Sequence, residues 1–123
     1  MFNEKFKDTL AHEGAVALVT CDGKEAHVAN TWNSYVNILG DNKLLIPAAG
    51  MRSIEQDAAN HSDLKITFGS KEVEGTQGMG AGFYLVGKGE FKEDGKEYEL
   101  MKAKFPWLRK VLIVTVDQVK QTI

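Results

Sequence analysis

Apolar residues in the N-terminal half recur with the periods of one short helix and two strand hairpins. Phe2, Phe6 and Leu10 stand four residues apart, which predicts an amphipathic helix over residues 3–12 that ends at Gly14. Four strand-like stretches follow, and each pair encloses a tight-turn signal, Asp-Gly in the first case and Gly-Asp-Asn in the second. The strands expected from them lie at residues 15–20, 25–30, 35–39 and 43–46.

The second half continues the alternation of strands with short helices. Ser53 and Gln56 have the spacing of a capping box, which predicts a helix from Ser53 to about residue 61. Leu64, Ile66 and Phe68 alternate with polar residues, the pattern of a half-buried strand. The remaining elements are expected as a flexible glycine-rich loop at 75–82, a strand at 83–91, a helix near 98–105 that ends at Pro106, and a final strand at 111–116.

The order and length of these elements favour a mainly β fold. Most of the expected strands are joined by turns too short for the crossovers that parallel strands require. We therefore expect one domain over residues 1–123, an antiparallel barrel with short helices that cap its openings. Such a barrel has little interior room for a flat three-ring ligand, so a ligand of that kind would bind on the outer wall and be covered by a second subunit.

Composition argues against two classes of partner. The formal net charge of -2 provides no overall basic field for a nucleic acid backbone. No apolar run approaches the ~20 residues of a membrane span, and the N-terminus lacks the pattern of a secretory signal. The single cysteine, Cys21, permits no internal disulfide, so a cytoplasmic location is the expectation.

Two aromatic residues stand among short polar ones in the run Asn30-Thr31-Trp32-Asn33-Ser34-Tyr35. Trp32 and Tyr35 are either ordinary residues of a barrel wall or the lining of a site for the isoalloxazine ring of a flavin. Four short hydrogen-bonding side chains in so few residues are unusual for a plain strand and favour the second interpretation. Such groups match the acceptors and the donor at the edge of a flavin ring.

A second stretch, from Pro47 to Ser53, stops a strand, bends through small residues and opens a helix. The free N–H groups of such a helix start bind phosphate, and Arg52 adds a forked cationic donor. A capped surface helix without a ligand explains the same residues, and Gly50 lets a ligand approach the backbone closely. Flavin mononucleotide (FMN) needs flat apolar surface, short polar groups and an anion-binding helix start, so the two stretches together predict an FMN site.

Other residues carry weaker signals. Trp107 is either a further ring against the flavin or an anchor for the preceding helix. His12, His27 and His61 are far apart in sequence and predict no metal site, and Cys21 lacks a neighbouring histidine that would make it a catalytic thiol. A basic patch is either a solvated face or a docking site for an acidic redox partner, and its members are Lys102, Lys104, Arg109 and Lys110.

The whole chain resembles the split-barrel flavoproteins, a family that includes the small FMN-binding proteins of sulfate-reducing bacteria and is related to pyridoxamine 5'-phosphate oxidase. The resemblance rests on the run at 30–35, the turn Pro47–Met51, Gly69-Ser70-Lys71 and the tail Gln121-Thr122-Ile123. It implies a six-stranded antiparallel split barrel of Greek-key type, a homodimer, and one FMN per subunit at the dimer interface.

The resemblance also implies roles for single residues. Ile123 would reach the flavin of the partner subunit, and Glu13 matches an acidic position near the ring. The family has lysine and threonine at the helix opening where this chain has Ser53 and Ile54, so Arg52 and Ser53 are expected to replace them. The residues expected to bind the cofactor are Asn30, Thr31, Trp32, Ser34, Tyr35, Pro47, Ala49, Gly50, Met51, Arg52, Ser53, Trp107 and Ile123.

Three functions are compatible with these features. The first is a non-covalent FMN protein that carries electrons in redox metabolism. The second is an FMN-dependent reductase or oxidoreductase of the same superfamily that acts on a small substrate, for which the sequence names no catalytic residue. The third is a dimeric binding module without a flavin, for which the changed phosphate contacts are the best argument.

Overall fold

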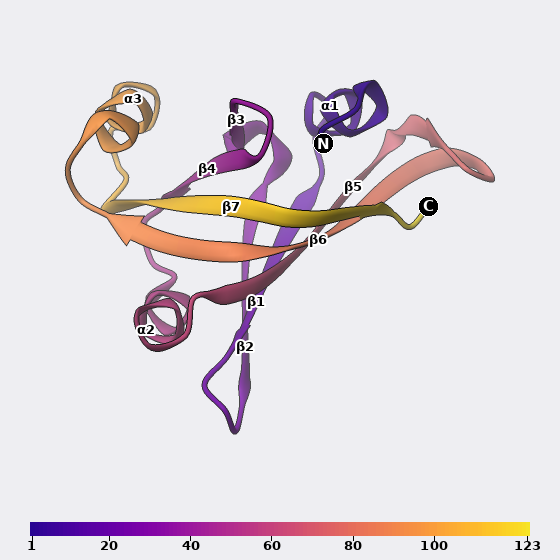
Figure 1. Cartoon of the computed structure of the whole chain (residues 1–123). Helices are drawn as coiled ribbons and strands as arrows, with labels where there is room; N and C mark the ends of the chain where they lie inside the picture. Colours follow the sequence, from indigo (N-terminus) through magenta and orange to yellow (C-terminus); the bar gives the residue numbers. More distant parts are fainter.

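One continuous antiparallel sheet organises the chain in the computed structural model, which describes residues 1–123 (Figure 1). The strands are β1 (Ala15–Cys21), β2 (Ala26–Trp32), β3 (Asn37–Leu39), β4 (Lys43–Ala48), β5 (Asp63–Gly75), β6 (Gly78–Lys92) and β7 (Lys110–Gln121). The helices are α1 (Glu4–Leu10), α2 (Arg52–Asn60) and α3 (Lys96–Lys104), with a 3-10 turn η1 (Asn33–Tyr35). None of these helices has the length and apolar character needed to cross a membrane.

The strand order is β2-β1-β5-β6-β7-β4-β3, and every neighbouring pair is antiparallel. The predicted antiparallel, mainly β fold with short helices is therefore confirmed. The predicted six-stranded barrel is not: the sheet has seven strands, and its outer strands β2 and β3 do not pair with each other. The short strand β3, which the local pattern predicted at residues 35–39, pairs with the first half of β4 and lies at the edge of the sheet, and it brings the count to seven.

Aromatic residues form the centre of the main core. Phe6 is fully buried and stacks on Phe2 with ring centroids 4.5 Å apart. Its ring also meets Phe68 and Phe83 edge-on, at 5.0 Å and 5.3 Å. The four-residue spacing at the N-terminus thus places α1 on the sheet because it turns apolar side chains toward the strands β5 and β6.

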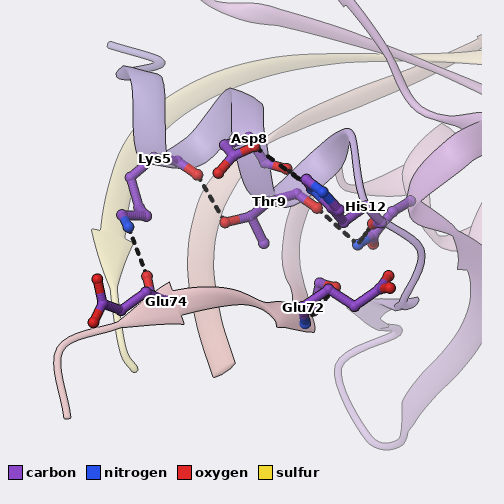
Figure 2. A network of polar contacts seen from close by, with 8 residues as sticks. Lys5, Asp8, Thr9, His12, Glu72 and Glu74 are labelled. Atoms are coloured by element: carbon purple, nitrogen blue, oxygen red, sulfur yellow. Dashed lines mark hydrogen bonds and ion pairs between the residues drawn. The ribbon is translucent and has the colours of Figure 1, made fainter. Parts of the chain in front are cut away.

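Polar contacts fix both ends of α1. The side chain of Asn3 caps the helix by accepting a hydrogen bond from the N–H of Phe6 at 2.9 Å. Figure 2 shows that Lys5 reaches across to β5, where its Nζ donates to the carbonyl oxygen of Glu74 at 2.6 Å. In the same view, His12 Nδ1 lies 2.8 Å from the carbonyl oxygen of Asp8, just beyond the helix end.

The predicted flexible loop at residues 75–82 is wrong. Gly75 is the last residue of β5, and the other glycines of the segment belong to β6. The two strands pair as far as Gly75 and Gly78, so the hairpin turn contains only two residues. Gly78 and Gly80 have φ values of 130° and 115°, which are open to glycine and strained for other residues. Glycine therefore permits a twisted hairpin here, whose tip lies near the C-terminus (Figure 1).

A second, smaller core lies under α3. Met101 is fully buried and packs with Leu45, Leu108, Val111 and Ile113. This cluster holds α3 against β4 and β7. It also fixes the segment between α3 and β7, which contains Trp107, beside the end of β4.

Candidate functional site

Nine of the residues predicted to bind a cofactor line one groove of about 350 Å³. They come from the outer strand β2, from η1, from the turn between β4 and α2, and from the segment before β7. Because β2 and β4 are far apart in the strand order, the sheet must curl strongly for both to share a groove. The lining residues are Ala29, Asn30, Thr31, Trp32, Tyr35, Pro47, Ala49, Gly50, Met51 and Trp107.

Aromatic rings provide most of the apolar surface of the groove. Trp32 and Trp107 are each 49% exposed, an unusual state for so large an apolar side chain. Tyr35 packs with two further rings, at centroid distances of 5.5 Å to Trp107 and 5.2 Å to Phe105, and those two rings lie 5.7 Å from each other. Trp107 thus lines the groove and packs on Phe105 at the end of α3, whereas its contact with a flavin ring stays a prediction.

The polar run at 30–35 is divided between the groove and the interior. Asn33 is fully buried, and its Nδ2 donates to the carbonyl oxygens of Thr9, His12 and Gly69 at 3.3, 2.8 and 3.0 Å. The Nδ2 of Asn30, on the groove, donates to the carbonyl oxygen of β1 residue 16 at 3.1 Å. Asn33 therefore anchors η1, and this anchoring sets the positions of the rings on either side of it.

The turn that opens α2 presents unpaired backbone donors. Met51 adopts a left-handed conformation with φ 57°, the only residue other than glycine with positive φ in the chain. Such a conformation costs on the order of 1 kcal/mol and is a common feature of ligand sites. The N–H groups of residues 49–54 donate to no acceptor within the chain. Open space surrounds the Cα of Gly50, so a ligand has access to this backbone.

The helix α2 begins two residues earlier than a cap at Ser53 predicts. Met51 occupies the cap position, and no side chain accepts a hydrogen bond from the helix start, so the predicted cap by Ser53 is wrong. The left-handed Met51 sets the direction of the chain and moves Ser53 into the first turn. Arg52 and Ser53 are exposed beside the groove rather than within its lining, and Arg52 forms no ion pair in the chain. Ile54 is buried.

Arg109 ties the turn to the rest of the molecule. Its Nε donates to the carbonyl oxygen of Ala49 at 3.1 Å and its Nη2 to that of Gly50 at 2.8 Å. The same Nη2 lies 2.7 Å from Glu55 Oε1, and Lys110 Nζ lies 2.6 Å from Glu55 Oε2. The hydrogen bond from Arg109 holds the pKa of the Glu55 carboxyl below its usual range.

These contacts change the interpretation of the basic patch. Arg109 and Lys110 are paired with Glu55, and Lys102 Nζ donates to the carbonyl oxygens of Pro106 and Leu108 at 2.7 Å and 3.2 Å. Lys102 thus stabilises the segment around Trp107, while Arg109 and Lys110 are committed to contacts with α2 and the turn before it. They do not form an uncommitted basic surface.

Besides Arg52 and Ser53, two more predicted residues, Ser34 and Ile123, lie outside the lining of the groove. The Oγ of Ser34 donates to Glu13 Oε2 at 2.8 Å, and this bond lowers the pKa of the Glu13 carboxyl. Ile123 lines a different groove, which also contains Glu13, and is 57% exposed. The carbonyl oxygen of Gly82 accepts from Thr122 N at 2.8 Å, which holds the C-terminal tail on β6.

A buried carboxylate connects α2 to the first hairpin. Asp57 is 4% exposed, and its Oδ2 accepts from Thr20 Oγ1 at 2.7 Å and lies 2.7 Å from His27 Nδ1. The hydrogen bond to His27 lowers the pKa of Asp57, and the same bond raises the pKa of His27. The negative charges of Asp22 and Glu25, which lie near His27, also raise the pKa of His27.

Sequence reasoning missed four residues of this region. Ala29 and Phe105 had a local signal, since each is adjacent to an aromatic run already singled out. Arg109 was assigned only to the basic patch, and no local signal links it to Glu55, because the two residues are 54 positions apart in the chain and meet only after folding.

Comparison with known proteins gives one clear relative in sequence. The chain is 38% identical over 118 residues to the FMN-binding protein of Nitratidesulfovibrio vulgaris (strain Miyazaki F), and the match covers 96% of each chain. A scan against protein-family models finds no match.

Solved structures are similar in fold at much lower identity. HupZ of Group A Streptococcus superposes with a TM-score of 0.81 at 17% identity, covering 98% of this chain and 94% of that chain. An FMN-binding protein from Syntrophomonas wolfei gives 0.73 at 12% identity, with 88% of this chain and 76% of that chain covered. A putative pyridoxamine 5'-phosphate oxidase from Listeria innocua gives 0.66 at 14% identity, with 98% and 95% covered.

Proposed function

Because this chain belongs to the FMN-binding protein family of split-barrel flavoproteins, we propose that it binds FMN non-covalently in the groove beside Trp32 and carries electrons. The observation that carries the proposal is the convergence of Trp32, Tyr35 and Trp107 with the backbone of the β4–α2 turn. These groups come from four separate parts of the chain, and the flavin is the ligand that uses all of them.

The rings fit the apolar part of the cofactor. Trp32 and Trp107 each keep half of their surface exposed, and a flat ligand between subunits would remove that surface from water. The packed cluster around Tyr35 limits the motion of Trp107, which lowers the entropy cost of binding a ring against it. Asn30 and Thr31, at the same groove, supply short polar groups for the ring edge.

The start of α2 fits the phosphate. The unpaired N–H groups of residues 49–54 and the positive end of the helix attract an anion. Arg52 and Ser53 are exposed next to them and can donate from their side chains. The side chain of Ile54 is buried and has no donor. The phosphate contact that the family makes with a threonine is therefore left to the backbone and to these two side chains.

FMN, when bound, supplies one- and two-electron redox chemistry. The residues of this chain would hold it, orient it and control its access to solvent. A half-open groove leaves part of a bound ring within reach of a redox partner protein, as an electron carrier needs. We further propose a homodimer, because exposed Trp32, Trp107 and Ile123 are large apolar side chains that a second copy would cover.

The test is the flavin content of the purified protein. A yellow protein that releases FMN on denaturation, and takes it up again at one FMN per chain, is the expected result. Sedimentation equilibrium with and without FMN measures the dimer. A colourless protein that remains colourless in excess FMN would refute the proposal.

Buried Ile54 is the one observation that favours a second function, a dimeric binding module without flavin. It removes a side-chain hydroxyl that the family places at the phosphate. The same titration separates the two functions, since a module of that kind would dimerise in the absence of FMN and show no saturable change on its addition.

A further inference from the structure

Arg109 holds three consecutive peptide groups of the β4–α2 turn in one orientation. Its backbone N–H donates to the carbonyl oxygen of Ala48 at 2.8 Å. Its guanidinium donates hydrogen bonds to the next two carbonyl oxygens, those of Ala49 and Gly50. Every peptide bond in the chain is trans, so the C=O and N–H of each peptide group point in opposite directions. The N–H groups of Ala49, Gly50 and Met51 therefore point away from Arg109.

These three N–H groups are among those that lack acceptors in the chain. The side of the turn that faces Arg109 presents carbonyl oxygens, which repel an anion. The opposite side presents donors, which attract one. An anion at the turn is thus expected on the donor side, where Arg109 is not a direct contact.

The guanidinium is itself held in place. Arg109 and Glu55 have side chains that are 24% and 22% exposed, and their bond of 2.7 Å links the turn to the first turn of α2. Lys110 occupies the other oxygen of Glu55 and touches neither turn carbonyl. Arg109 is thus the connection between the turn and the helix, and Lys110 is a neighbouring cation without that role.

We propose that Arg109 is a positioning residue for phosphate recognition: it orients the turn so that the Gly50 and Met51 N–H groups bind the phosphate of the flavin nucleotide. The inference rests on the proposed function of the groove. It deepens that function by assigning discrimination between FMN and riboflavin, which lacks the phosphate, to a residue that does not touch either.

The test compares the affinities of the protein for FMN and riboflavin by quenching of flavin fluorescence. In Arg109→Gln we expect the Kd for FMN to rise about tenfold, the loss that follows when a hydrogen bond to a charged group is misaligned. The Kd for riboflavin should change by less than about twofold, because the ring contacts remain. The Lys110→Gln variant is the matched control, since it removes the same charge from the same carboxylate and should leave both affinities as in the wild type.

Arg109→Lys keeps the charge but cannot bridge two carbonyl oxygens and Glu55, so it should show the same loss for FMN alone. The Arg109→Lys variant also replaces Arg109→Gln in the test if the latter does not fold. In the wild type, FMN but not riboflavin should shift the amide resonances of Gly50 and Met51. An equal loss for both ligands, or the same loss in Lys110→Gln, would overturn the positioning role. A wild type that binds neither flavin would instead overturn the proposed function.

Discussion

Removal of the Trp32 indole is the perturbation that bears most directly on the groove. In Trp32→Ala we expect the affinity for FMN to fall by about 2 kcal/mol, roughly 30-fold in Kd. Some loss of stability is expected as well, because the other half of the residue's surface is buried within the chain. The affinities are therefore compared under conditions in which the variant is folded.

The magnitude follows from the surface that Trp32 leaves exposed. A tryptophan side chain carries up to about 250 Å² of surface, and 49% of the residue's surface is exposed. On the order of 100 Å² is thus free to be covered, worth about 2.5 kcal/mol at 25 cal/mol per Å². A ring contact adds roughly 0.5–1.5 kcal/mol. Incomplete coverage and contacts that the alanine retains reduce the sum to about 2 kcal/mol.

The assay is a fluorescence titration of apoprotein with FMN, accompanied by a thermal melt. Leu100→Ala is the control, because Leu100 is an exposed apolar residue on α3 that does not line the groove. It should leave the affinity for FMN unchanged. A Trp32→Ala variant that binds FMN as tightly as the wild type would refute the placement of the flavin ring against this side chain.

Three further predictions concern the scaffold and its pH dependence. Phe6→Ala should lower the free energy of unfolding by about 3–5 kcal/mol, measured by urea denaturation, since Phe6 is fully buried among other rings. Asn33→Ala should cost about 1–3 kcal/mol and also weaken FMN binding, because it frees η1; unchanged binding would contradict the anchoring role. The ion pair of His27 and Asp57 stabilises the fold between the unfolded pKa values of about 3.9 and 6.5. Its contribution is lost as pH rises through the raised folded pKa of His27 or falls through the lowered folded pKa of Asp57. The melting temperatures of wild type and His27→Gln should therefore differ most near about pH 5.5 and converge toward about pH 9. An equal difference at the two pH values would contradict a stabilising role of this ion pair.

Most elements of the fold were predictable from local patterns. The helix at the N-terminus, the first hairpin and the strand around Ile66 have a period, a cap or a turn signal in their own residues. The elements that were predicted wrongly are those in which contacts with a distant part of the chain outweigh the local sequence preference. Gly78–Gly82 has the composition of a loop, but β5 pairs with that part of the chain and extends the strand β6 through it.

The helix start at residue 52 shows the same limit. Ser53 and Gln56 have the spacing of a capping box, and local energetics favour Ser53 as the cap. In the structure, Arg109 holds the two carbonyls before Met51, and the helix begins directly after the left-handed Met51. A contact across 59 residues thus competes with a local preference worth about 1 kcal/mol.

The chemical character of the groove was present in the amino-acid sequence, since rings, short polar groups and a helix start are properties of Trp32, Tyr35 and the Pro47–Ser53 stretch themselves. The convergence of these groups in one groove was not present in the sequence. It depends on a sheet curled enough to bring β2 beside β4, and on long-range bonds made by Asn33 and Arg109. A residue type sets which contacts a side chain is able to make, whereas the path of the whole backbone sets which of them are within reach.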